Sequence, residues 1–579
     1  MDAHRSTYTE VKLRDADIVM APDRLGAMHQ NRISFVRSLI RKMASQEWQV
    51  SKHEWQLCPR GFGHVIYKLV TPAHVYHLVV FCDEIADEER NDRVIAEKWD
   101  VTFALVKGDV NVELLEQLRD NVPLQEAGRN PNNVLVLARA NKSVRVFEHI
   151  VRALSKGEQP EPKELADVGY ILRTTAVYGN GKFGIADFKL LENNPDFSQS
   201  FSAQMCAVYM LREFSLDWVH YLAYQQGGGN AITLHKGLQR YLGVGNATGL
   251  GMAPYLINHP CVVDQWMTSR ERAIANVLAQ PCDAVALEMP LQTLLSKAQR
   301  HLEQVVTINT HQDKLNHQAK EDIKTLQVNL NALMVAHSNW ASLIEQTSTM
   351  SLEAQEILIS CLIELYPALV DEFENQMNTD ESLSIPGGKS VQDVLQVLEH
   401  RYRWSIDADY SLPENNYWFW YRSQDKEEPR LGVRGEEIGE ERELPLDIGR
   451  QVNRLYRTLQ KCQSETSLAE FLLKKPQYRA ITRRVWTLGN RAMGDIQMNV
   501  LRKDALPMHL LRCKLAIFGA TKFDPRSDRW VRVTFFQGAP LLDEIHDPNY
   551  TDTWIFPIMP ERGDIERSNN QRIDGGVAL

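Results

Sequence analysis

The chain has 579 residues, of which 44% are hydrophobic and 24% are charged, close to the average of globular proteins. This length provides material for about three or four domains and for a sizeable hydrophobic core. The formal net charge of -10 lacks the basic surplus that a general nucleic-acid binder usually carries, so we predict no nucleic-acid partner.

The sequence also bears on the compartment. It has no run of about 18 apolar residues, so we expect no membrane-spanning helix, and its polar N-terminus is unlike a secretory signal. Eight cysteines lie far apart without a CxxC pair, which is typical of reduced thiols in a cytosolic protein. We therefore predict a cytoplasmic protein without a membrane partner.

The first 155 residues alternate between strand and helix patterns. After a polar arm over residues 1–30, apolar residues recur at helical spacing from Asn31 to Met43. Turn signals separate three strand-like runs, which predicts an antiparallel meander followed by a fourth strand and two helices. The predicted strands are 47–57, 63–70, 75–81 and 99–106, and the predicted helices are 112–118 and 144–154.

Helical patterns dominate the middle of the chain. Residues 164–285 read mainly as helices interrupted by glycine-rich loops, and 288–345 form a long, mostly helical segment. An apolar stripe runs from Leu315 to Leu333 in steps of three and four residues. A second helix, 352–377, could fold back on this segment as a hairpin.

The C-terminal part returns to strands. We predict helices over 391–402, 446–459 and 468–473, and strands over 415–421, 515–518 and 530–536. The strands near the two termini could join one sheet.

The prediction is therefore an α+β fold, with antiparallel strand modules near both termini and a large central, mostly helical region. The predicted domains are an N-terminal α+β module (1–155), a helical region with two glycine-rich loops (164–285), a long helical hairpin (286–380) and a C-terminal α+β module (381–579).

The first glycine-rich loop spans residues 173–184 and reads RTTAVYGNGKFG. We predict a helix from Val168 to Tyr178 that Gly179 ends. Arg173 and Lys182 suit a carboxylate or phosphate, since a guanidinium and an ammonium group donate charged hydrogen bonds. Tyr178 would transfer a proton if nearby cations lower its pKa. Thr174 and Asn180 are further candidates for substrate binding.

The second loop, residues 243–254, reads GVGNATGLGMAP and contains GxGxxxG. A dinucleotide-binding fingerprint would place GxGxxG after a strand, whereas residues 231–242 look helical. Three interpretations stay open: a nicotinamide site, a tight turn for close packing, or a substrate loop. The substrate loop would use Asn246, Thr248 and Asn258, with His259 as a general base.

Three smaller features complete the candidates. Gly227 to Asn230 is typical of a helix start with Asn230 as the N-cap. Arg422 lies beside an aromatic strand and could contact an anion. Histidines and acids gather in the N-terminal strands, but His74 and His77 would face opposite sides of a strand and no HxH or HExxH occurs. We predict no metal site.

These features indicate a cytosolic enzyme that acts on a small anionic substrate by acid-base chemistry, as a lyase, isomerase or hydrolase. Tyr178, Lys182 and His259 are the predicted catalytic residues, and we expect the two glycine loops to meet at one pocket. One alternative is an NAD(P)-dependent oxidoreductase that uses the loop 243–251. Another is a scaffold that uses the long helices. Because the apolar stripe needs a covering surface, we expect a homodimer.

Overall fold

A computed structural model describes most of the chain. The described residues are 13–28, 33–86, 98–121, 131–176, 185–186, 191, 194–197, 201–249, 256–257, 259–337, 339–374, 382–416, 418–420, 430–432, 448–497, 506–525, 530–547, 554–567 and 572–573.

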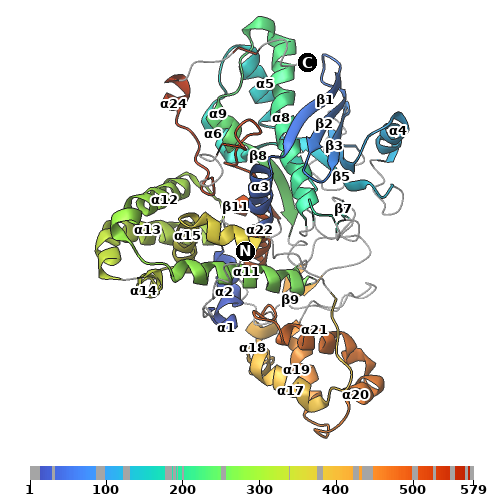
Figure 1. The fold of residues 1–579 in the computed structure, drawn as a ribbon, viewed down its shortest axis with the longest axis vertical. Coiled ribbons are helices and arrows are strands. Elements are labelled where there is room, and N and C mark those ends of the chain that lie inside the picture. Colours follow the sequence, from blue (N-terminus) through green and yellow to red (C-terminus); the bar gives the residue numbers. More distant parts are fainter. Residues whose placement is uncertain are drawn as a thin grey trace, which may run out of the picture. The chain divides into compact units, whose positions relative to one another are not determined.

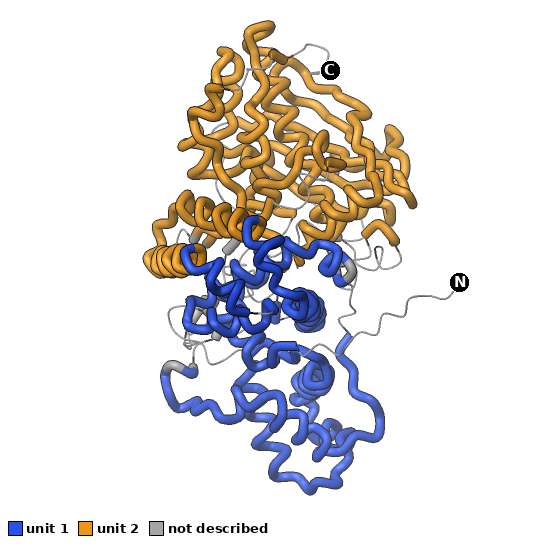
Figure 2. Tube along the Cα trace, turned by 60° about the vertical axis from the view of Figure 1, so that its left-hand side comes forward, with its two compact units in different colours: residues 1–29, 249–289, 328–515 blue, residues 30–248, 290–327, 516–579 orange. Residues whose placement is uncertain are grey.

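The chain separates into two compact units, each assembled from several stretches of sequence. Unit 1 contains residues 1–29, 249–289 and 328–515, and unit 2 contains residues 30–248, 290–327 and 516–579 (Figure 2). Unit 2 combines the strands of one large sheet with several helices, whereas unit 1 is mainly helical. The fold is therefore α+β, as predicted, and the four predicted domain ranges stay a prediction.

Unit 2 is built on one sheet, in which the described residues form ten strands (Figure 1). Nine of them follow the order β1-β2-β3-β4-β5-β6-β8-β12-β11, and β7 pairs with β5. The pairs from β1 to β6 are antiparallel, as is β11 with β12, whereas β6 and β8 run parallel. The strands are β1 Gln49–Leu57, β2 Gly63–Val70, β3 Val75–Cys82, β4 Val101–Lys107, β5 Val134–Lys142, β6 Tyr170–Thr174, β7 Ile185–Ala186, β8 Gly243–Gly249, β11 Ala520–Pro525 and β12 Trp530–Phe535.

The strands form because β-branched and aromatic residues suit a pleated, buried surface. In β3 the run VYHLVVFC is buried along most of its length. Residues of β2 to β5 pack with Leu114 and Leu118 of α4 in one apolar cluster on one face of the sheet. The other face carries α8, a long helix that contacts β4, β5, β6 and β7 and is buried on nearly all sides. A helix that is apolar all round belongs in a core.

Of the other helices of unit 2, α5 and α3 contact α8 (Figure 1). Ser34 accepts a hydrogen bond from the backbone N–H of Arg37 and so caps α3, in the manner expected of a serine N-cap. The helices are α3 Phe35–Ser45, α4 Val112–Asn121, α5 Phe147–Ser155, α6 Pro162–Val168, α8 Ser202–Gly227, η2 Gly228–Asn230, α9 Lys236–Tyr241 and α24 Arg562–Arg567.

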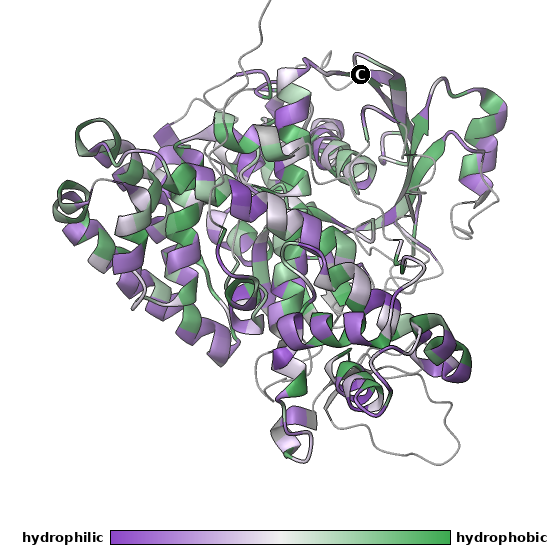
Figure 3. Ribbon diagram, turned by 60° about the horizontal axis from the view of Figure 1, so that its bottom comes forward, coloured by the Kyte–Doolittle hydropathy of each residue, from purple (hydrophilic) through white to green (hydrophobic). Residues whose placement is uncertain are grey.

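Unit 1 is mainly helical, and hydrophobic residues alternate with hydrophilic ones along its helices (Figure 3). Its elements are α1 Ala16–Val19, α2 Pro22–Ala27, α11 Pro260–Leu278, α14 Trp340–Gln346, α15 Leu352–Glu364, α16 Pro367–Glu374, α17 Val391–Arg401, α18 Arg403–Ile406, η4 Pro413–Asn416, β9 Trp418–Trp420, β10 Arg430–Gly432, α19 Ile448–Leu459, α20 Leu468–Lys474, η5 Pro476–Tyr478 and α21 Arg479–Gly489. Three helices have residues in both units: α12 Ala284–Gln304, α13 Thr310–Ala336 and α22 Leu506–Phe518.

The predicted antiparallel meander is confirmed, because β1, β2 and β3 pair in sequence order. The joining of the N- and C-terminal strands is confirmed as well, since β11 and β12 extend the same sheet beyond β8. The hydrophobic alternation that predicts each strand also determines which face it buries, so these expectations agree with the fold.

Four local predictions are wrong. Residues 170–174 form strand β6 instead of a helix, because Gly169 takes a φ of 82° and ends α6 there. Gly227 ends α8 and Asn230 is not a helix N-cap; α9 begins later, with His235 as its N-cap. Residues 515–518 belong to α22, and the strand follows them. The first 30 residues contain α1 and α2, whose inner residues are buried.

The apolar stripe of α13 is covered within the chain itself. Ala319, Ile323, Leu326 and Leu330 are all at most 1% exposed. Gln327 donates a hydrogen bond to Ser296 of α12, at 3.0 Å between Nε2 and Oγ, so α12 lies against α13 at this level. This stripe therefore gives no reason for a second chain to cover it.

Candidate functional site

The sheet brings the starts of the two glycine-rich segments together. Strand β6 carries Arg173 and Thr174 at its carboxyl end, and β8 contains most of the second segment. The two strands are parallel neighbours, with Tyr170 opposite Gly243 and Arg173 opposite Gly245. Parallel strands end at the same edge of a sheet, and ligands of open sheets commonly bind beyond such carboxyl ends.

Arg139 and Arg173 share one face of the sheet. In the antiparallel pair of β5 and β6, Arg173 lies opposite Asn141, so Arg139 is its diagonal neighbour two residues away on β5. Diagonal neighbours on one face lie about 7–8 Å apart at their Cα atoms, close enough for two long side chains to contact one small ligand. Arg173 is half-buried and, within the described part of the chain, makes no ion pair.

Arg139 is held in a protected position. Its guanidinium carbon lies 4.5 Å from the centre of the Trp99 ring, and the residue is only 3% exposed. Burial lowers the pKa of the Arg139 guanidinium to about 10. The hydration that the charge loses therefore outweighs the favourable interactions that it makes in the folded chain. An anion bound beside Arg139 would favour the charged form of its guanidinium group and so raise its pKa.

Two threonines follow along the same strand edge. The backbone N–H of Thr175 donates to the carbonyl of Arg139 at 3.0 Å, which continues the ladder by one residue. The Thr175 hydroxyl is buried and has no hydrogen-bond partner among the described residues. By contrast, the Thr174 hydroxyl donates to the carbonyl of Arg139 and accepts from the N–H of Ala176. Thr174 thus stabilises the turn after β6, while Thr175 has a hydroxyl free for a ligand.

Several predicted site residues lie outside the described residues: Tyr178, Asn180, Lys182, Asn258 and Arg422. Thr248 belongs to β8 through its backbone. His259 precedes α11 in unit 1, and its side chain does not cap that helix. The catalytic roles of these residues stay predictions.

Chain length limits how far the residues after β6 can be from Arg173. Tyr178 follows Thr174 by four residues and Lys182 by eight. An extended chain covers at most about 3.6 Å per residue, which gives about 14 Å and about 29 Å. These lengths are upper limits on the separation along the chain, so the roles of Tyr178 and Lys182 stay predictions.

Asn246 is buried in an unusual way. It is 1% exposed, and neither its side-chain nitrogen nor its oxygen has a hydrogen-bond partner among the described residues. Leaving a buried polar group unsatisfied costs about 1–3 kcal/mol, and such groups are rare in folded proteins. Asn246 was predicted to bind substrate, and its unmet hydrogen bonds are compatible with that role.

The glycines of the GxGxxxG segment have a packing role. A Cβ atom at Gly243 would lie 2.1 Å from the carbonyl oxygen of Phe535, and one at Gly245 would lie 2.5 Å from the ring of Tyr170. These glycines let neighbouring strands approach closely. Because they lie inside β8 instead of in a turn between strand and helix, they lack the context of a dinucleotide-binding loop.

Asp196 anchors another polar network in unit 2. Its carboxylate accepts hydrogen bonds from the Thr71 hydroxyl at 2.9 Å and the Tyr76 hydroxyl at 2.7 Å, and lies 2.9 Å from His74 Nδ1. His77 contacts the Gly108 carbonyl instead. Across the described ranges, no group of three or more His, Cys, Asp or Glu side chains is arranged to hold a metal ion. The network therefore joins local turns to the sheet.

Glu213 of α8 has a raised pKa. Burial raises the pKa of this carboxyl to about 7, although Arg212, 3.5 Å away, and the N–H of Leu542 favour its charged form. Arg212 itself donates to backbone carbonyls, among them those of Leu242 and Pro540. The two side chains thus connect α8 to the chain before β8 and to the C-terminal segment. The charge of Glu213 changes with pH near neutrality.

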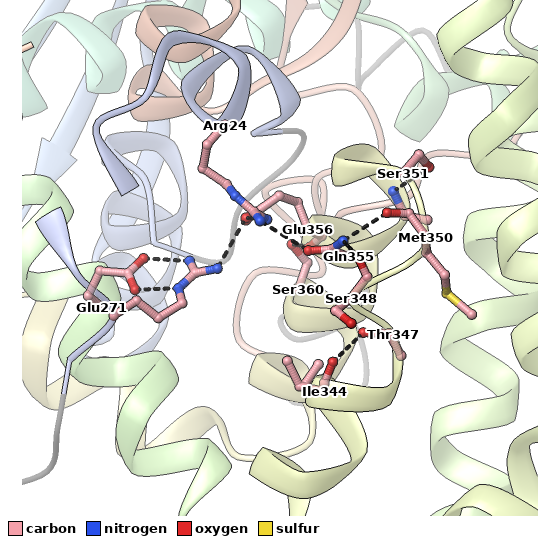
Figure 4. A network of polar contacts seen from close by, with 12 residues as sticks. Arg24, Glu271, Ile344, Thr347, Ser348, Met350, Ser351, Gln355, Glu356 and Ser360 are labelled. Atoms are coloured by element: carbon pink, nitrogen blue, oxygen red, sulfur yellow. Dashed lines mark hydrogen bonds and ion pairs between the residues drawn. The ribbon is translucent and has the colours of Figure 1, made fainter. Parts of the chain in front are cut away.

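Unit 1 contains a buried cluster of arginines and glutamates. Arg14 donates two hydrogen bonds of 2.7 Å to the carboxylate of Glu271. Arg24 donates to Glu356 at 2.9 Å (Figure 4). Arg270 contacts both carboxylates. Burial alone would raise the pKa of Glu356, but the charges of Arg270, Arg14 and Arg24 outweigh it and lower that pKa to about 2. Because each carboxylate is already paired, this cluster is a structural element.

Sequence reasoning missed Arg139 and Thr175. A charged residue inside the apolar run LVLARANK was the available signal for Arg139, because buried charges are rare and often functional. Thr175 lies within the quoted loop, but its role depends on its pairing with β5.

Comparison with known proteins gives no relative: no family model matches the chain, and neither a curated protein nor a solved structure matches it. A search of the described residues finds no helix with the length and apolar character needed to span a bilayer.

Proposed function

We propose that the chain is an enzyme that acts on a small anionic metabolite, with the anion held on the β5–β6 face of unit 2. The observation that supports this most is the diagonal pair of Arg139 and Arg173 on one face, near the carboxyl end of β6. Two guanidinium groups suit a carboxylate or phosphate through paired hydrogen bonds.

The proposed chemistry is acid-base catalysis by groups that follow β6. Tyr178 would transfer the proton, and Lys182 would place positive charge beside the substrate and lower the pKa of the tyrosine. A lyase, isomerase or hydrolase would fit this set. The predicted substrate contacts of Asn246 and Thr248, in the same unit, belong to the same proposal, as does a cytoplasmic location.

Titration with inorganic phosphate and with succinate tests the anion site. We expect the intact protein to bind at least one of them, and Arg173→Met and Arg139→Met each to weaken that binding about 10- to 150-fold. This range corresponds to about 1.5–3 kcal/mol for a hydrogen bond to a charged group. Isothermal titration calorimetry at low ionic strength provides the measurement.

Arg152→Met is the matched control, because Arg152 is exposed on α5 in the same unit. It should leave the affinity unchanged. Methionine keeps the aliphatic stem, and thermal melting of Arg139→Met shows whether that variant stays folded. Equal affinities in all four proteins would refute the site.

A second candidate function, partner binding by the long helices, rests on an exposed apolar patch in unit 1. Val285 and Met289 of α12 are 99% and 72% exposed, and Val328 and Val335 of α13 are 80% and 71% exposed. A hydrogen bond from Asn331 to Glu288 joins the two helices between them. Exposed apolar patches often mark interfaces.

If the patch builds the proposed homodimer, light scattering should give about twice the chain mass of 66.3 kDa at micromolar protein. Val328→Glu should return the particle to the monomer mass by placing a charge in the interface. A monomer mass for the unaltered protein would exclude the dimer.

A further inference from the structure

Helix α19 of unit 1 carries a row of basic residues. Arg450, Arg454 and Arg457 lie four and three residues apart on this helix, and Lys461 follows in the turn after it. Residues at this spacing share one face of a helix. Residues 448–464 include no acidic residue. The net charge of -10, which argues against a general nucleic-acid binder, is therefore an average over the chain that hides this basic row.

The basic row lies on the solvent side of α19. The helix packs against α17, α18 and α21 (Figure 1). Its opposite, apolar face is buried there and consists of Ile448, Val452, Leu455 and Leu459. Each of these residues is two positions away from a residue of the basic row, and two positions are about 200° around a helix. In agreement with this, Arg454, Arg457 and Lys461 are exposed.

The charges of the basic row are not used within unit 1. Arg454, Arg457 and Lys461 form no ion pair with any of the described residues. The Arg450 guanidinium carbon lies 5.2 Å from the centre of the Tyr410 ring, which holds this side chain in place. Like charges three or four residues apart repel each other on a helix, and a cation in the first turn, such as Arg450, also opposes the helix dipole. The basic row therefore lowers the stability of α19 and points to an anionic partner.

The burial of the apolar face limits which partner fits. A basic amphipathic helix binds a membrane surface or a protein groove by inserting its apolar face. Helix α19 can do neither, because that face is already packed inside unit 1. Protein interfaces also need an apolar core, and α19 exposes no large hydrophobic residue. The partner that remains is one recognised by its charge alone, and a nucleic-acid backbone is recognised in this way.

We propose that the basic row of α19 binds the phosphate backbone of a nucleic acid without reading its sequence. Eleven residues separate Arg450 from Lys461, or about 16 Å of helix, so its cations are about 4.5–6 Å apart along the axis. A nucleic-acid strand carries one phosphate per about 3.4 Å of duplex, so each cation has a phosphate within reach. Three of the four cations are arginines, whose forked guanidinium groups suit phosphate oxygens. This surface belongs to unit 1 and does not depend on the anion site of unit 2.

The test measures how salt changes the binding of a fluorescent DNA duplex of about 20 base pairs to the full chain, by fluorescence anisotropy. Four phosphate contacts should make the affinity fall about 150-fold between 50 and 200 mM salt, because each contact adds about -0.9 to the slope of log K against log salt. The double variant Arg454→Gln with Arg457→Gln keeps two contacts, so its affinity should be lower at 50 mM and fall only about 12-fold over the same range. Both positions are exposed and glutamine suits a helix, so the variant should melt at the same temperature as the unaltered protein.

The matched control is Arg145→Gln with Arg152→Gln, which removes the same charge from two exposed arginines of unit 2. It should keep the affinity and the salt dependence of the unaltered protein. Phosphate binding should stay unchanged in the Arg454 and Arg457 variant, which separates this result from the test of the anion site. The proposal is overturned if the duplex does not bind at 50 mM salt, or if the two double variants behave alike. It is also overturned if poly-glutamate displaces the duplex at an equal concentration of charge, because the partner would then be an acidic protein.

Discussion

Glu356→Ala should destabilise unit 1 by about 3–5 kcal/mol, the range seen when one partner of a buried ion pair is removed. Glu356 is 1% exposed and is the shared partner of Arg24 and Arg270. Without it, these guanidinium groups would stay buried with one carboxylate fewer to balance them. Urea unfolding monitored by circular dichroism measures the change.

Glu345→Ala is the control for this substitution, because Glu345 is exposed on α14 in the same unit. It should change the stability by no more than about 0.5 kcal/mol. A loss below about 1 kcal/mol in Glu356→Ala would mean that the cluster is solvated, and our account of unit 1 would fail.

Glu213→Gln should remove a pH dependence from the stability of unit 2. The pKa of Glu213 is about 7 in the folded chain against an ordinary value of 4.5. Between these values the folded state holds a proton that the unfolded state has released, so stability falls as the pH rises through this window. A shift of this size corresponds to about 3 kcal/mol.

The glutamine variant mimics the protonated form at every pH. It should match the unaltered protein near pH 4, below both pKa values, and be more stable than it above pH 7, as measured by unfolding at several pH values. Glu113→Gln, at an exposed position of α4, should keep the original pH profile. Identical slopes in the unaltered protein and Glu213→Gln would show that Glu213 titrates normally.

The sequence was sufficient to predict secondary structure and strand order where the local pattern and the tertiary packing agree. In β1 to β3, apolar alternation bounded by turn residues predicts both the strands and their antiparallel order. The same kind of pattern gave a wrong prediction at β6. Val168, Leu172 and Ala176 have helical spacing, but α6 ends at Gly169, which has a left-handed backbone conformation. The backbone conformation of one glycine outweighed a weak periodic signal.

The candidate site was only partly predictable for a related reason. Arg173 and Asn246 could be selected from their glycine-rich surroundings. Arg139 could not, because its importance comes from the register of β5 against β6, where it becomes the diagonal neighbour of Arg173. The pairing of strands that are far apart in the sequence cannot be predicted from a local sequence pattern.

A crystal structure of the protein grown with inorganic phosphate or succinate tests the anion site most directly. We predict an anion on the β5–β6 face, with oxygens about 3 Å from nitrogens of both Arg139 and Arg173 and with the Thr175 hydroxyl turned toward it. The opposite result would show no anion on that face, with neither guanidinium group in contact with a bound ligand. In that case the two arginines would be structural and the proposed function would have no site.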